Sequence, residues 1–179
     1  MKHGKKGNMS NCMFRLMVLF YKIAGREKRA PAVLKQIDIV KGEKILDYGC
    51  GPGTYSFSAS DMVGQDGLIY CADIQPVAVD MIKKRAEKGG IRNIKTIVTS
   101  CETGLSENSI DKVFLFDVYH NFQDPAANLK ELFRVIKQNG TLAIIIDHQD
   151  SDVVIREIES LSEFKFSEKR PGVILMKCP

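Results

Sequence analysis

A short apolar segment that runs directly into a loop of alternating glycines constrains the fold of this chain more than any other feature. Residues 45–48 (I-L-D-Y) are followed at residues 49–53 by G-C-G-P-G, with glycine at every second position. A backbone without side chains can approach a ligand closely and can adopt conformations that other residues avoid. A strand that leads through such a loop into a helix forms the ligand-facing corner of an open α/β sheet. The sequence therefore predicts a nucleotide-like ligand at this loop.

An acidic residue follows the next predicted strand. Asp73 comes directly after the apolar residues 68–72 and stands twenty positions beyond Gly53. A carboxylate at this place can accept hydrogen bonds from both hydroxyl groups of a ribose. We therefore expect the adenosine part of a cofactor to lie beside Asp73.

The spacing of the glycines indicates which adenosine-containing cofactor the loop binds. A dinucleotide-binding fold has G-x-G-x-x-G before a helix whose N-terminus meets the pyrophosphate. Here the pattern is G-x-G-x-G with Pro52 inside it, and no Gly-Lys-Ser/Thr of a phosphate-binding P-loop follows. Asp47, two positions before the first glycine, would repel a diphosphate but would attract a cation such as the ammonium of an amino acid. These features favour S-adenosylmethionine, a nucleoside that carries positive charge.

The segment from Asp47 to Gly53 resembles motif I of the class I S-adenosylmethionine-dependent methyltransferases. Residues 109–113 resemble the start of that family's fourth strand, and residues 129–140 resemble its helix and turn before the fifth strand. Within that family, the chain is similar to the small-molecule branch that includes the ubiquinone and menaquinone biosynthesis methyltransferases. It implies S-adenosyl-L-methionine as cofactor, S-adenosyl-L-homocysteine as product, and a small-molecule or isoprenoid-like acceptor.

Along the chain, apolar runs typical of strands alternate with segments of helical periodicity, and this order also predicts an α/β fold. The apolar runs 113–116 and 142–146 are typical of strands buried on both faces in a parallel sheet. Residues 164–169 and 173–177 flank Arg-Pro-Gly, a turn that joins antiparallel strands. We expect a Rossmann-like α/β sheet, mostly parallel, with a C-terminal antiparallel hairpin and helices on both faces. The other expected strands are residues 44–48, 67–72, 94–98, 111–116 and 141–146, and the expected helices are residues 55–62, 76–88, 125–137 and 152–162.

The N-terminal part of the chain differs from the rest in charge. Residues 1–44 hold 11 lysines and arginines against 3 acidic residues, a net charge of +8, whereas the remainder carries −4. We expect a basic arm with lid helices over residues 1–40 and a single S-adenosylmethionine-binding domain over residues 41–179. A basic arm can contact nucleic acid, anionic lipid or an acidic substrate, and a solvated leader is the alternative.

Residues 12–24 are apolar but too short and too charged to span a membrane, and no small-residue cleavage site follows them. Phe14, Met17, Val18 and Tyr21 recur at helical spacing, which predicts an amphipathic helix packed over the cofactor site as a lid. Peripheral contact with a membrane surface is the alternative role. A second short helix is expected at residues 32–36, beginning near a proline.

The five cysteines are scattered and form no C-x-x-C pair. This pattern argues against a disulfide framework or a zinc site and favours the reducing cytoplasm. Cys50, Cys71 and Cys101 follow or end three successive strands, and we interpret them as small residues that fill space beside a cofactor. Thiol-based metalloid chemistry is the alternative.

The rule that ligands bind at the carboxyl ends of strands selects the residues of the site. By resemblance, Gly49 and Gly51 would pass beneath the methionine part, Ile74 would lie against the adenine face, and Asp117 would close over the cofactor. Family members often have an aspartate near Ser100, which this chain lacks, so Glu102 is expected to accept from the adenine amine. The predicted cofactor-binding residues are Asp47, Gly49, Cys50, Gly51, Gly53, Asp73, Ile74, Cys101, Glu102 and Asp117.

Two histidines are the candidate catalytic residues. His120 follows the fourth predicted strand and His148 the fifth, so both are expected at the same edge of the sheet. A histidine can take the proton from an acceptor near neutral pH. A structurally bonded or solvent-exposed histidine is the alternative at each position.

The leading functional hypothesis is a methyltransferase for small molecules, with a non-catalytic S-adenosylmethionine-binding regulator as the alternative. A nucleic-acid methyltransferase is disfavoured because residues 117–120 (D-V-Y-H) lack the prolines that cradle an exocyclic amine. A mass of 20.0 kDa also leaves no room for a separate target-recognition domain. The acceptor pocket must be small, be built by the N-terminal helices, or be completed by the partner in a homodimer.

Overall fold

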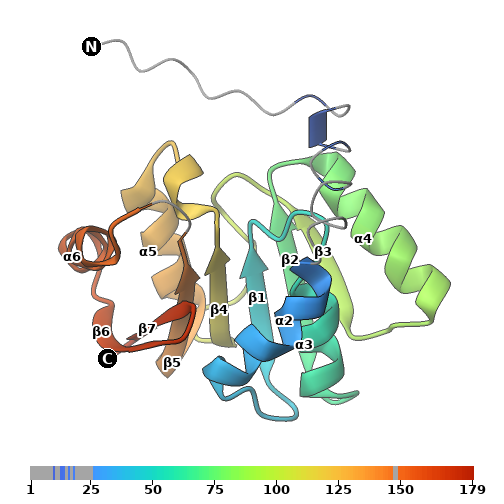
Figure 1. Ribbon diagram of the computed structural model, residues 1–179, viewed down its shortest axis with the longest axis horizontal. Coiled ribbons are helices and arrows are strands. Elements are labelled where there is room, and N and C mark those ends of the chain that lie inside the picture. Colours follow the sequence, from blue (N-terminus) through green and yellow to red (C-terminus); the bar gives the residue numbers. More distant parts are fainter. Residues whose placement is uncertain (1–9, 11–12, 15, 17, 19–25, 147–148) are drawn as a thin grey trace.

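The computed structural model of the protein describes residues 10, 13–14, 16, 18, 26–146 and 149–179. Within these ranges a single sheet of seven strands is covered by helices on both faces (Figure 1). The strands are β1 (Lys44–Tyr48), β2 (Leu68–Asp73), β3 (Ile94–Val98), β4 (Ile110–Phe116), β5 (Ile136–Ile145), β6 (Lys165–Arg170) and β7 (Val173–Lys177). The helices are α2 (Arg26–Leu34), α3 (Ser56–Val63), α4 (Pro76–Gly89), α5 (Pro125–Val135) and α6 (Ser151–Leu161), with 3-10 turns η1 (Lys35–Ile37) and η2 (Tyr119–Asn121).

The strand order across the sheet is β3-β2-β1-β4-β5-β7-β6. The first five strands pair in parallel, whereas β7 is antiparallel to both β5 and β6. The order reverses at β1, whose two neighbours are β2 and β4, and such a switch point opens a crevice at the carboxyl ends of the strands. The expected sheet, mostly parallel with a C-terminal antiparallel hairpin, is confirmed.

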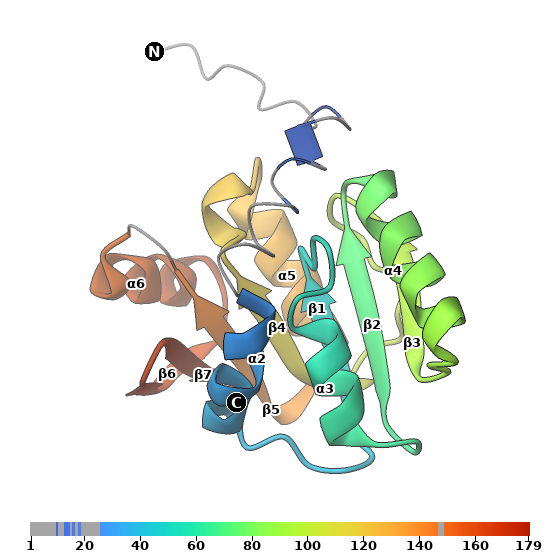
Figure 2. The ribbon, with the colours of Figure 1, turned by 45° about the vertical axis from the view of Figure 1, so that its right-hand side comes forward.

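Successive residues of β1 pack into two separate hydrophobic cores, one on each face of the sheet. Ile45 packs with the buried side chains of α3 and α4, and Leu46 with those of α5 and α6. Figure 2 shows α2 and α3 in front of the sheet and α5 behind it. Because side chains of a strand point alternately to opposite faces, a continuous apolar run is what a sheet covered on both faces requires.

The boundaries near Ile136 and near Pro31 differ most from the sequence-based expectation, whereas most others agree to within one residue. The helix predicted over residues 125–137 ends at Val135, because Ile136 already has extended dihedral angles (φ −74°, ψ 144°) and pairs with Ile110 in the neighbouring strand. The short helix expected at residues 32–36 instead begins at Arg26 and contains Pro31. Burial of Ala30 and Leu34 holds this helix on the core and overrides the tendency of proline to begin a helix.

The described part of the N-terminal segment packs on α4. Phe14 and Val18 are buried against Ala78, while Met13 and Leu16 are exposed. Met17 and Tyr21, which belong to the same predicted lid helix, lie outside the described residues. The boundary between an arm and a domain at residue 40 stays a prediction. Among the described helices, none has the length and apolar character needed to cross a membrane.

Candidate functional site

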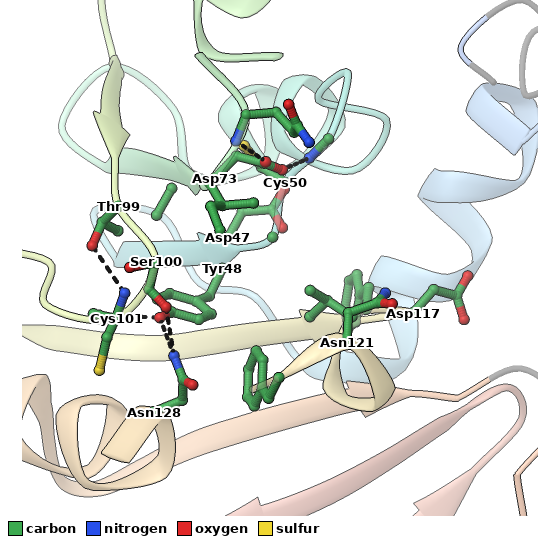
Figure 3. A pocket seen from close by; sticks show the side chains of 18 of the residues that line it. Asp47, Tyr48, Cys50, Asp73, Thr99, Ser100, Cys101, Asp117, Asn121 and Asn128 are labelled. Atoms are coloured by element: carbon green, nitrogen blue, oxygen red, sulfur yellow. Dashed lines mark hydrogen bonds between the residues drawn. The ribbon is translucent and has the colours of Figure 1, made fainter. Parts of the chain in front are cut away.

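A cavity of about 480 Å³ opens at the carboxyl ends of β1, β2, β3 and β4. Loops that follow these four strands form its walls, together with Asn128 in the first turn of α5 and Phe14 from the N-terminal segment. Figure 3 shows labelled side chains from the ends of all four strands and from α5 arranged around this space. The cavity therefore lies at the topological switch point, where ligands of open α/β sheets bind.

The glycine loop lines the cavity with bare backbone. Gly49, Gly51 and Gly53 all have positive φ angles, of 80°, 52° and 80°. A Cβ atom on Gly49 would lie 2.4 Å from Cγ2 of Val118, so no other residue fits there without displacing its neighbour. A Cβ atom on Gly51, by contrast, would meet nothing within 4 Å. Since Gly51 lines the cavity, this open space is where a ligand can approach the backbone.

Asp73 joins the glycine loop to the end of β2. Its Oδ2 accepts a hydrogen bond from the N–H of Gly51 and its Oδ1 one from the N–H of Gln75, both at 2.8 Å. Each carboxylate oxygen keeps a further acceptor position, and the side chain lines the cavity. Burial raises the pKa of this carboxyl, although the backbone N–H groups of Gln75, Gly51 and Ile74 act in the opposite direction. The geometry fits two neighbouring hydroxyl groups, such as those of a ribose.

Asp47 lies deeper, at the end of β1. Its carboxyl is 2% exposed, and the hydroxyl of Ser56 donates a hydrogen bond to its Oδ2 at 2.5 Å. Burial raises the pKa of Asp47 to about 7, the Ser56 hydrogen bond lowers it, and the charge of Asp73 adds to the increase. A cation placed in the cavity would favour the ionised form. This part of the site therefore has the chemistry to hold an ammonium group.

The loop after β3 forms another wall and is held from below by two buried polar side chains. Asn128 Nδ2 donates hydrogen bonds to the hydroxyl of Tyr48 at 2.6 Å and to the carbonyl of Ser100 at 2.9 Å. The Tyr48 hydroxyl in turn donates to the carbonyl of Cys101 at 3.0 Å. Figure 3 shows this network beneath the loop. Sequence reasoning missed Tyr48 and Asn128 as site residues.

A signal for Asn128 was present in the sequence. Asn128, Leu132 and Val135 recur at helical spacing and all three are buried, so a polar residue stands on the apolar stripe of α5. A buried amide needs partners, which points to a polar neighbour or a ligand. The sequence signal for Tyr48 is weaker, because a glycine motif contacts its ligand through the backbone and gives no indication of a role for the side chain beside it.

Aromatic and apolar side chains line the part of the cavity near the end of β4. The ring of Tyr55 packs edge-on against Phe116 at 4.7 Å between centroids, and Phe116 stacks on the buried Phe114 at 4.8 Å. Phe14, which packs on Ala78 of α4, lines the cavity from the N-terminal segment. Asp117 adopts a left-handed conformation (φ 54°) directly after the strand and also lines the cavity.

The structure brings most of the predicted cofactor-binding residues together, but not all of them. Gly53 lies outside the cavity lining, and its backbone is packed against the ring of Phe57 instead. Glu102 is exposed and also lies outside the lining, so its expected contact with adenine has no support in the geometry. The predicted residues that line the cavity are Asp47, Gly49, Cys50, Gly51, Asp73, Ile74, Cys101 and Asp117.

The two candidate catalytic histidines are placed differently. His120 lies in the turn η2, which the sequence did not predict, and it is exposed with its ring beside the Asn121 amide at 3.0 Å. Asn121 and Phe122 line the cavity, whereas His120 does not. His148 lies outside the described residues.

Two cysteine thiols that line the cavity have pKa values raised by burial. Burial raises the pKa of Cys50 well above its usual value, and the neighbouring Cys71 thiol and the negative charges of Asp47 and Asp73 raise it further. The pKa of Cys101 is also raised, mainly by burial. A raised pKa disfavours the thiolate, which is the form that acts as nucleophile and metal ligand.

Comparison with known proteins defines the class to which this fold and site belong. A family model described as a methyltransferase domain matches residues 39–171, which include strands β1 to β6. The chain therefore belongs to this methyltransferase domain family.

Relatives of known sequence carry specific names. Aklanonic acid methyltransferase DauC from Streptomyces sp. (strain C5) is 37% identical over 97 residues, which are 52% of this chain and 44% of that protein. Demethylmenaquinone methyltransferase from Oceanobacillus iheyensis is 27% identical over 125 residues, 69% of this chain and 52% of the relative. The chain thus spans about half the length of these relatives.

Solved structures share the fold. A SAM-dependent methyltransferase from Aquifex aeolicus superposes with a TM-score of 0.76 at 25% identity, covering 84% of this chain and 89% of that one. A second structure, from Methanococcus maripaludis, has a TM-score of 0.77 and covers 97% of this chain and 96% of its own. At 13% identity the second likeness concerns the fold alone.

Proposed function

We propose that the protein is an S-adenosylmethionine-dependent methyltransferase that acts on a small-molecule or isoprenoid-like acceptor. The observation that carries this proposal is the pair of buried carboxyls, Asp47 and Asp73, on either side of a bare glycine loop in one cavity. Asp47 suits an ammonium, Asp73 suits two ribose hydroxyls, and the open side of Gly51 leaves room for the chain that connects them.

The residues of the cavity fit this cofactor from end to end. Gly49 and Gly51 would pass beneath the methionine part, and Ile74, which is 41% exposed, would cover one face of the adenine. The loop from Thr99 to Cys101 would lie at the adenine edge. When bound, the cofactor supplies a methyl group that is already activated by a sulfonium leaving group.

The protein's own part in the reaction is then mainly to position the acceptor and to exclude water. The aromatic side chains of Tyr55 and Phe116 suit an apolar acceptor held next to the methionine end of the site. The names of two relatives, for aklanonic acid and for demethylmenaquinone, agree with an acceptor of this kind. An acceptor that must lose a proton needs a base, and His120 and His148 remain our proposals for that role.

Calorimetry with S-adenosylmethionine and S-adenosylhomocysteine, followed by measurement of S-adenosylhomocysteine formation with a panel of phenolic, quinol and other apolar acceptors, tests the proposal. We expect binding of both ligands and turnover with at least one acceptor. Absence of affinity for either ligand would refute it. Binding without turnover on any acceptor would favour a non-catalytic regulator. The four cysteines among the described residues, Cys50, Cys71, Cys101 and Cys178, form no disulfide, and on this ground we propose the cytoplasm as the compartment.

A further inference from the structure

The side chain of Asn128 has one polar atom left to offer a ligand. Both hydrogens of its amide are used, one on the hydroxyl of Tyr48 and one on the carbonyl of Ser100. A carbonyl oxygen can only accept hydrogen bonds, so the nitrogen must face Ser100 and the orientation of the amide is determined. Figure 3 shows the nitrogen directed to these partners and the oxygen turned away from them. Among the described residues, no donor within hydrogen-bonding distance reaches this oxygen.

This amide oxygen belongs to a side chain that is 4% exposed and lines the cavity. It lies between the end of β1 and the loop that follows β3, since the amide bonds to both Tyr48 and Ser100. Glu102, the acceptor expected from the sequence, is exposed and outside the lining. The backbone N–H of Cys101 is already used by Thr99 Oγ1 at 3.1 Å. Asn128 is therefore a buried side chain in the cavity lining whose amide oxygen is available as a hydrogen-bond acceptor beside this loop.

We propose that Asn128 Oδ1 accepts a hydrogen bond from the exocyclic amine of the cofactor's adenine, and that it thereby makes the site specific for an amino-substituted purine. This inference rests on the proposed function, because it requires that the cavity holds an adenosyl group. Tyr48 is a positioning residue in it, since its hydroxyl fixes the amide and donates onward to the Cys101 carbonyl. A purine with a carbonyl at the same position would place two oxygens against each other, with no hydrogen between them.

The test compares three ligands by calorimetry: S-adenosylhomocysteine, its analogue without a substituent at purine carbon 6, and its 6-oxo (inosyl) analogue. The wild-type protein should bind the unsubstituted analogue about fivefold more weakly, the effect of one neutral hydrogen bond, and the 6-oxo analogue at least tenfold more weakly. Asn128→Ala should bind S-adenosylhomocysteine and the unsubstituted analogue within about twofold of each other. Tyr48→Phe should reduce the ratio of the two affinities partially, because the amide keeps only its Ser100 anchor.

Glu102→Ala is the matched control and should retain the wild-type ratio. A ratio of affinities does not respond to a general loss of stability, which would weaken both ligands alike. Equal binding of the amino and unsubstituted ligands by the wild-type protein would overturn the proposal even if Asn128→Ala failed to fold. An unchanged ratio in Asn128→Ala, or its loss in Glu102→Ala, would also overturn it while the proposed function stood. Failure of the wild-type protein to bind any of the three ligands would instead refute the proposed function itself.

Discussion

Replacement of Gly49 by alanine should unfold this protein far more readily than the same change two residues later. Gly49 has a φ of 80°, and its added Cβ would lie 2.4 Å from Cγ2 and 2.7 Å from Cβ of Val118. The left-handed conformation costs an alanine about 1–2 kcal/mol. The overlap with Val118 adds about 1–3 kcal/mol, because this half-buried β-branched residue between β4 and η2 is packed against the core and cannot move aside easily. We expect Gly49→Ala to lower the free energy of unfolding by about 3 kcal/mol.

Gly51→Ala is the matched control, because its Cβ would meet nothing within 4 Å and only the backbone cost of about 1 kcal/mol remains. Thermal and urea unfolding measure the difference. For a chain of 179 residues, 3 kcal/mol corresponds to a decrease in Tm of about 6–12 °C. Gly51→Ala should instead weaken S-adenosylhomocysteine binding, since its methyl group enters the cavity.

A double variant tests whether the clash itself is responsible. Val118→Ala removes the closest contact with a Cβ at position 49 but leaves its own Cβ at 2.7 Å. The double variant Gly49→Ala/Val118→Ala should therefore recover part of the stability lost by Gly49→Ala alone, with a coupling free energy of about 1 kcal/mol. If Gly49→Ala proved as stable as Gly51→Ala, or if the effects of Gly49→Ala and Val118→Ala were additive, the clash with Val118 would not be the reason that position 49 requires glycine.

The remaining predictions concern charge and catalysis. Asp73→Asn should weaken cofactor binding at least tenfold, because one ribose acceptor is lost, whereas Asp80→Asn on the exposed face of α4 should leave it unchanged. The pKa of Asp47 is raised to about 7 in the folded protein, so the folded state binds more protons than the unfolded state between pH 4 and 7. Unfolding free energy should therefore fall as pH rises through that interval, with a contribution from Asp47 of up to about 1.4 kcal/mol per pH unit. Asp47→Asn should reduce this slope in urea titrations, and a smaller slope of the same sign should remain from Asp73, whose pKa is also raised. An unchanged slope in Asp47→Asn would assign it to other groups. If either histidine is the base, His120→Ala or His148→Ala should lower kcat about 100-fold without changing cofactor affinity, and unchanged turnover in both would remove them from the reaction.

The order of strands and helices could be predicted because each strand here carries its own local signal. The first strand and its glycine loop, Asp73 after the second strand, and the turn at residues 170–172 are all visible in short windows of sequence. Apolar runs without alternation also revealed that both faces of the sheet are covered.

Other features depend on contacts between residues that are distant in the chain. Ile136 leaves the helical conformation because Ile110, twenty-six residues earlier, pairs with it across the sheet. Helix α2 extends to Arg26 despite Pro31 because Leu34 is buried in the core. Neither partner can be seen within the local window, so propensity alone placed both boundaries wrongly.

Some features of the candidate site could likewise be predicted from the sequence, whereas others depend on the packing of distant segments. The sequence by itself determined the glycine loop and its two carboxyls, because a bare backbone beside acidic residues at strand ends has few other uses in an α/β sheet. Only the tertiary structure decided that Glu102 is exposed outside the cavity lining and that Asn128, from a helix on one face of the sheet, is part of it. The reason is physical: a ligand is bound by side chains that converge in space, and Tyr48, Ser100 and Asn128 converge only when the strands and the helix are packed together.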